Sequence, residues 1–195
     1  MIQCSTNSKK LKLDLSFHGP SKTLLEEISE QGSRITLTDA DCWELDLREW
    51  IQFVRSDQSL ICPNLVRETS TVSMGLQLTD DSTVAALNSA WRCKTETTDV
   101  LSFPVFDEKV CLPRDQSVEL GDIVVSVNQA DQQAREHNHS LSHELRWLVS
   151  HGLLHLLGWD HPTAEKLNAM LSCQEQLLCI DGNLRSKVEP KRSDR

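Results

Sequence analysis

The stretch His151-Gly-Leu-Leu-His155-Leu-Leu-Gly158-Trp-Asp160-His161 holds three of the seven histidines of the chain. His151 and His155 are four residues apart, so on a helix they lie on one face. Gly158 allows the left-handed turn that commonly ends a helix, and this turn can bring His161 back toward the same point. Three neutral imidazoles converging there leave at least one coordination position of a zinc ion open. The stretch therefore predicts a catalytic type of zinc site, with one Zn²⁺ per chain.

The helix that carries His151 and His155 is expected to begin at Leu141 or Ser142 and to lie in the core. No formally charged side chain occurs between Trp147 and Trp159, and a helix that is apolar on nearly all faces is buried. A buried imidazole without a partner costs roughly 1–3 kcal/mol, so histidines bonded to carbonyls or carboxylates are the alternative to a metal site. Three histidines at this spacing favour the metal. Asp160 is expected either to orient a ligand imidazole or to be a solvated turn residue.

Hydrophobic periodicity along the rest of the chain predicts an α+β fold with a small sheet covered by helices. Alternating apolar and polar residues indicate strands over residues 11–17, 72–78, 99–106 and 120–127. Pro104 interrupts the third of these, which favours a sheet edge or a bulge. Residues 21–34 are expected to form a loop or a short helix. Longer helices are expected after caps at Thr38-Asp39, at residues 79–82 and at Thr163, over residues 128–137, and through the histidine stretch.

The length of 195 residues suits one domain, assigned to residues 1–184, with a disordered basic tail over residues 185–195. No apolar run approaches the ~20 residues of a membrane span, and the N-terminus lacks a signal-peptide pattern. A cytoplasmic protein that does not enter the membrane is therefore expected. Seven cysteines without a Cys-x-x-Cys pair indicate reduced, mostly structural thiols.

The formal net charge of −9 weighs against a general nucleic-acid binder. The basic tail carries five basic and two acidic side chains, so the rest of the chain is more acidic still. Contact with RNA therefore requires a local basic cleft, the tail or a bound metal.

The histidine spacing matches the zinc helix of metzincin peptidases, His-Glu-x-x-His-x-x-Gly-x-x-His. The glutamate that acts as general base in those enzymes would stand at position 152, where this chain has Gly152. Peptide hydrolysis needs that base. A peptidase function is thus disfavoured, although the metal site is kept.

Three blocks of the chain resemble the YbeY family of bacterial rRNA maturation factors. The first is the histidine stretch, in which Trp159 stands where that family more often has tyrosine. The second runs from Leu87 to Pro104 and includes Leu-Asn-Ser-Ala-Trp-Arg and Thr-Asp-Val-Leu-Ser-Phe-Pro; the third is Leu120-Gly-Asp-Ile123. Their order and spacing agree over roughly residues 72–180, whereas residues 1–71 agree only in outline.

This resemblance implies a zincin-like α+β fold, with a small mixed four-stranded sheet and about five helices. It implies a single-strand-specific, metal-dependent endoribonuclease that matures the 3′ end of 16S rRNA and acts in late-stage ribosome quality control. The implied metal ligands are His151, His155 and His161, and the implied catalytic residue is Arg92. The implied partners are single-stranded rRNA and the small ribosomal subunit with its assembly proteins.

The chemistry of these residues agrees with phosphodiester cleavage. A metal and a guanidinium facing one pocket stabilise the extra negative charge on the phosphate oxygens. A metal can also supply hydroxide near neutral pH without a protein carboxylate, so Gly152 is tolerable for this substrate. From spacing alone, a solvated arginine at a helix end is the better interpretation of Arg92, and only the resemblance of its block favours a catalytic role. Two other functions stay open: a zinc hydrolase of a non-RNA substrate, and a ribosome-assembly factor whose metal is structural.

Overall fold

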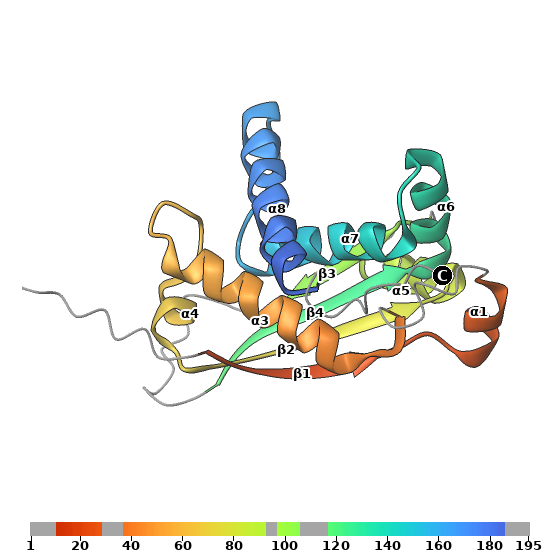
Figure 1. Ribbon diagram of the computed structural model, residues 1–195, viewed down its shortest axis with the longest axis horizontal. Helices are drawn as coiled ribbons and strands as arrows, with labels where there is room; N and C mark the ends of the chain where they lie inside the picture. The colour runs from red at the N-terminus through yellow and green to blue at the C-terminus, as the bar shows by residue number, and fades with distance from the viewer. Residues whose placement is uncertain (1–10, 29–36, 93–96, 106–116, 186–195) are drawn as a thin grey trace, which may run out of the picture.

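The computed structural model describes residues 11–28, 37–92, 97–105 and 117–185 of the chain. At its centre is a four-stranded sheet in the order β1-β2-β4-β3 (Figure 1). The strands are β1 (Lys12–His18), β2 (Thr71–Thr79), β3 (Val100–Pro104) and β4 (Val118–Ser126). β1, β2 and β4 are parallel, and β3 is antiparallel to β4 at the edge. The predicted mixed sheet is confirmed, with Pro104 at the end of an edge strand.

Five longer helices accompany the sheet among the described residues, which confirms the expected number and the α+β class. They are α3 (Ala40–Ser56), α5 (Asp81–Arg92), α6 (Val127–His137), α7 (Leu141–Leu156) and α8 (Ala164–Arg185). The caps at Asp39 and Thr163 form as predicted, since Asp39 accepts two backbone N–H groups of its helix and Thr163 accepts one. Two short helices are also present, α1 (Lys22–Glu27) within the expected loop region and α4 (Asn64–Glu68). No sequence signal predicted α4, which is only five residues long.

Neighbouring residues of β4 show that helices cover both faces of the sheet. Ile123 lies against Gly152 of α7, whereas Val124 packs with Val84 of α5 and Leu101 of β3 in a smaller cluster. Because successive side chains of a strand point to opposite faces, α5 and α7 lie on opposite sides of β4. The main core lies on the side of α7 and also includes α3, β1 and β2.

Two long-range contacts fix the helices on the α7 side, where α8 rises away from the sheet (Figure 1). The Arg146 guanidinium of α7 forms an ion pair with Asp46 of α3, with Nε and Oδ2 3.1 Å apart and both side chains largely buried. The Trp50 indole of α3 donates a hydrogen bond of 2.9 Å to the carbonyl of Leu177 in α8. The first contact ties α7 to α3 and the second ties α3 to α8, so the three helices are joined to one another.

At Gly152, α7 packs closely against Ile123 of β4. A Cβ atom added there would lie 2.9 Å from Cγ2 of Ile123 and 3.3 Å from its Cγ1 and Cδ1. Real Cβ atoms are essentially never found so close to a neighbour. The glycine therefore lets the helix pack directly on β4, and a glutamate at this position would push the two apart.

The predicted basic tail, residues 185–195, lies outside the described residues except for Arg185, which ends α8. The assignment of residues 1–184 to one domain stays a prediction. No helix in the described part of the chain has the length and apolarity that crossing a membrane requires.

We expect Gly152→Ala to lower the free energy of unfolding by about 1–3 kcal/mol, the usual cost of overpacking a core. In an Ile123→Ala background the same change should cost nothing, or stabilise by up to about 1 kcal/mol, because alanine favours a helix more than glycine does. Urea denaturation of the parent, the two single variants and the double variant measures both costs. Equal costs in the two backgrounds would show that the contact with Ile123 does not require the glycine.

Candidate metal centre

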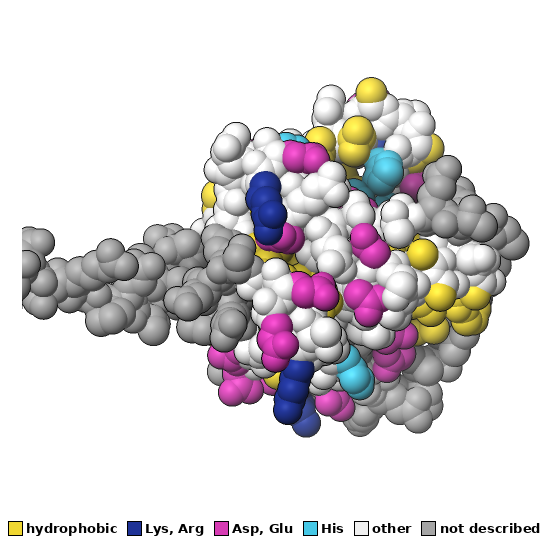
Figure 2. All heavy atoms as spheres, turned by 90° about the vertical axis from the view of Figure 1, so that its right-hand side faces the viewer, with side chains coloured by type: hydrophobic (Ala, Val, Ile, Leu, Met, Phe, Trp, Pro, Cys, Tyr) yellow, Lys and Arg dark blue, Asp and Glu magenta, His cyan; other side chains and the backbone are white. Residues whose placement is uncertain are grey.

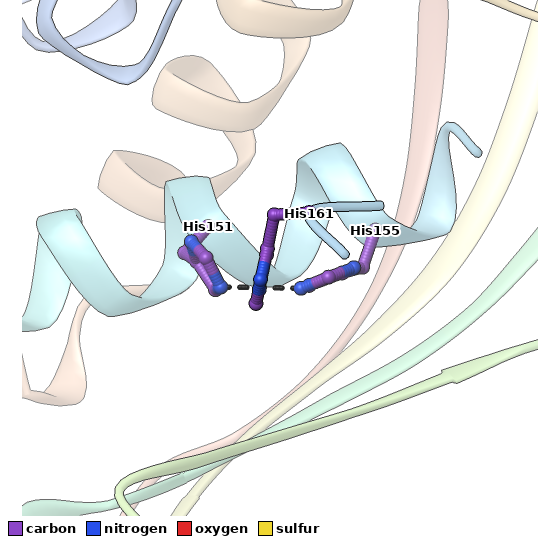
Figure 3. A group of neighbouring side chains, drawn as sticks. All are labelled: His151, His155 and His161. Atoms are coloured by element: carbon purple, nitrogen blue, oxygen red, sulfur yellow. Dashed lines mark hydrogen bonds between the residues drawn. The ribbon is translucent and has the colours of Figure 1, made fainter. Parts of the chain in front are cut away.

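The structure brings His151, His155 and His161 together, as the sequence predicts (Figure 3). Ring centroids lie 4.7 Å apart for His151 and His155, 5.4 Å for His151 and His161, and 5.1 Å for His155 and His161. Each ring offers one nitrogen such that all three lie within 4.8 Å of one another. The three side chains can therefore face a single ion.

The turn after α7 carries His161 back to the other two histidines. Gly158 adopts a φ of 90°, the left-handed conformation expected there. Its N–H donates to the carbonyl of His155, and the N–H of Trp159 donates to that of Leu154, both at 3.0 Å. This pair of bonds is the Schellman arrangement that ends many helices. Asp160 accepts the backbone N–H of His161 at 2.8 Å, so its hydrogen bond shapes the turn rather than orienting an imidazole.

A backbone carbonyl fixes the tautomer of His155. Its Nδ1 lies 2.9 Å from the carbonyl oxygen of Trp159. A carbonyl can only accept, so Nδ1 carries the proton and Nε2 of the neutral ring carries the lone pair. Trp159 is itself held in place because its indole donates a hydrogen bond of 2.8 Å to the carbonyl of Ile61.

Gln174 of α8 fixes the tautomer of His151 in the same way. The Gln174 amide nitrogen donates to the carbonyl of Trp147 at 3.1 Å, so its oxygen faces Nδ1 of His151, 3.0 Å away. Nδ1 of His151 therefore donates, and its Nε2 carries the lone pair. Gln174 is fully buried. Such partners of ligand imidazoles are a regular part of metal sites.

The two lone pairs face each other across a short gap, because Nε2 of His151 and Nε2 of His155 are 3.1 Å apart (dashed line in Figure 3). Burial lowers the pKa of both histidines, which favours the neutral rings. Two lone pairs at this distance repel unless a cation lies between them. Zinc at 2.0–2.1 Å from tetrahedral ligands places donor nitrogens about 3.3 Å apart. The residues thus fit a zinc ion.

Two polar residues near the site have roles that the sequence did not reveal. One is Gln174. The sequence feature that could have identified it is its position as a polar residue within the apolar stripe of α8 formed by Leu167, Met170 and Leu177. Asp99 is the other, and its negative charge acts on the imidazole of His151. The amide of Gln133 in α6 donates to the Asp99 carboxylate at 3.1 Å.

Arg92 is the last residue of α5, and its side chain lies outside the described part of the chain. Its role in catalysis therefore stays a prediction. The preceding residue, Trp91, is 72% exposed and forms an edge-to-face contact with Phe103, with ring centroids 6.1 Å apart. Both rings line a cavity of about 650 Å³ on the α5 side of the sheet, which the three histidines do not line.

We expect Gln174→Leu to weaken zinc binding 10–100-fold, the usual effect of removing a residue that orients a ligand imidazole. Gln176→Leu is a matched control, because it makes the same change at an exposed position of the same helix. Competition with a chromogenic chelator at neutral pH measures both affinities, and circular dichroism checks that both variants are folded. If the two variants bind zinc equally well, Gln174 does not orient His151.

Comparison with known proteins extends the match beyond the histidines. Residues 33–180 match the family model described as Endoribonuclease YbeY. A protein of that name from Prochlorococcus marinus (strain MIT 9313) is 53% identical over 184 residues, covering 94% of this chain and 98% of that protein. Another, from Parasynechococcus marenigrum (strain WH8102), is 55% identical over 150 residues, covering 77% of this chain and 81% of the relative. A solution structure from Thermotoga maritima aligns at 23% identity with a TM-score of 0.48, covering 93% of this chain and all of that one. On the family model and the curated relatives together, the chain belongs to the endoribonuclease YbeY family.

Proposed function

We propose that the protein is a zinc-dependent endoribonuclease that cleaves single-stranded rRNA, acting at the 3′ end of 16S rRNA and in late-stage ribosome quality control. The observation that carries the proposal is the pair of Nε2 lone pairs of His151 and His155, which buried partners direct at one point. The relatives named Endoribonuclease YbeY supply the substrate class. The proposed partners are the small ribosomal subunit and its assembly proteins.

Different residues of the chain have different roles in the proposed phosphodiester cleavage. The three histidines hold the ion and, being neutral, leave its positive charge uncompensated. A zinc ion held there stabilises negative charge on phosphate oxygens and lowers the pKa of water. Arg92 is proposed to bind the same phosphate through its guanidinium. Gly152 leaves no side chain to serve as a peptidase base and no room for one, which favours RNA over peptides as the substrate.

A preference for single strands is supported by the exposed aromatic ring beside Arg92. Trp91 is 72% exposed and Phe103 lies against it. Unpaired bases can stack on such rings, whereas the faces of bases within a duplex are already covered by their neighbours. We therefore propose that this surface, on the α5 side of the sheet, receives an unpaired base of the bound strand.

We expect Arg92→Ala to keep its zinc and to cleave a single-stranded rRNA oligonucleotide about 10²–10³-fold more slowly, the usual loss when one group that stabilises transition-state charge is removed. Arg135→Ala is a matched control, since Arg135 is an exposed arginine of α6. Single-turnover cleavage with fully metallated proteins gives the rates, and a duplex of the same sequence tests the strand preference. Equal rates for Arg92→Ala and the parent would refute the role proposed for Arg92.

We expect His155→Ala to lose the zinc ion of the three-histidine site and, with it, cleavage. In cells depleted of the parent protein, the folded variant should leave the 3′ ends of 16S rRNA unprocessed, as mapped by sequencing of rRNA ends. Normal 3′ ends in those cells would show that the protein acts as an assembly factor rather than as a nuclease. Proteolysis of casein that depends on His151 would instead identify a hydrolase of another substrate.

A further inference from the structure

A second group of metal-binding side chains lies at the corner between α6 and α7. His137 ends α6, Asn138 adopts a left-handed φ of 58°, and His139 follows it. The N–H of His139 donates to the carbonyl of Ala134 at 3.0 Å, and Ser140 then caps α7. The reversal is thus fixed by backbone hydrogen bonds, and it brings His137 and His139 to one side of the corner.

Glu144, in the first turn of α7, points its carboxylate at these two histidines. Its side chain is only 5% exposed. One carboxylate oxygen is hydrogen-bonded to Nε2 of His139 and lies 3.8 Å from Nδ1 of His137. A buried carboxylate needs a cation or hydrogen-bond donors to offset its desolvation. Within the described residues, only this group and the three histidines of the first site place three such ligand atoms within 4.8 Å of one another.

The spacing and the ligand types of the cluster suit a metal ion. The rings of His137 and His139 are 5.5 Å apart, and those of His139 and His143 are 4.7 Å apart. One divalent ion can bind the lone pairs of neutral rings at this spacing and offset the charge of the buried Glu144 carboxylate. Two imidazoles and one carboxylate are a known donor set for zinc.

We propose that His137, His139 and Glu144 form a second site for a divalent transition metal of the zinc class, which joins α6 to α7. Glu144 and His151 are seven residues apart on one helix, which separates the two sites by about 10 Å along α7. Metal pairs that act jointly in catalysis lie about 3.5–4 Å apart. The second site is therefore independent of the first, and the inference does not rest on the proposed function.

The exposure of the ligands allows an ion to enter the site, and it identifies a substitution that should not disturb folding. The His137 side chain is 62% exposed and that of His139 is 29% exposed, so an ion can enter from the side of His137. Replacement of an exposed residue at a helix end rarely affects folding. His137→Ala is thus the first variant to test. Glu144→Gln, which removes the charge and keeps the shape, is the second.

Zn²⁺ titration of the tag-free full chain against a chromogenic chelator tests the site. We expect two equivalents for the parent protein and for the control His18→Ala, whose histidine lies on β1. We expect one equivalent for His137→Ala, one for Glu144→Gln, one for His155→Ala, and none for His137→Ala combined with His155→Ala. A single equivalent in the parent that His155→Ala removes would overturn the proposal, as would two equivalents retained by His137→Ala.

Thermal unfolding with and without Zn²⁺ distinguishes binding at a folded site from nonspecific binding to histidines. Zn²⁺ should raise the Tm of His155→Ala, because ligands that bind only the native state stabilise it. It should leave the Tm of the double variant unchanged. An equal rise in the two variants would show that the corner cluster is not the binding site, whatever the activity of the first site on RNA.

Discussion

The direct packing of α7 on β4 at Gly152 is the constraint on which the metal centre depends. With residue 152 facing the sheet, the 100° turn per residue places His151 and His155 about 100° and 60° around the helix axis, on the same flank. From that flank both imidazoles reach His161, with ring centroids 5.4 and 5.1 Å from its ring. A side chain at 152 would lift the helix from Ile123. Gly152 therefore has two effects: it allows the close packing of the helix, and it leaves the chain without the glutamate that peptidases have at this position.

Packing positions the imidazole rings of His151 and His155, and hydrogen bonds to their Nδ1 atoms determine which nitrogen of each ring faces the site. Gln174 of α8 orients His151, and the carbonyl of Trp159 orients His155. The indole of Trp159 is tied in turn to the carbonyl of Ile61, before α4. The tautomer of His151 thus depends on a residue 23 positions away, and that of His155 depends, through Trp159, on a bond that spans 98 positions. This explains why the site needs the whole fold although its ligands span eleven residues.

Those features of the fold that depend on local sequence could be predicted, and those that depend on packing could not. The cap at Asp39, the edge position of β3 and the left-handed Gly158 follow from local chemistry, and each was found as predicted. The steric reason for glycine at 152 depends on Ile123, which is distant in sequence, so no local pattern could show it. The sequence did not indicate the corner cluster, because the cluster depends on a left-handed turn at Asn138. Glycine is the residue that usually marks such a turn, and asparagine marks it less clearly.

The acidic composition of the chain restricts where a negatively charged substrate such as RNA can bind. Acidic side chains are spread over the face shown in Figure 2, whereas lysine and arginine cover little of it. Such a surface repels phosphates in general, so attraction must be confined to the site. A divalent ion bound by three neutral histidines keeps its full charge for a phosphate. Binding by two histidines and Glu144 would cancel half of that charge, which suits an ion that holds helices together. The difference in ligand charge thus supports the two proposals, phosphate binding at the first site and a structural role for the second.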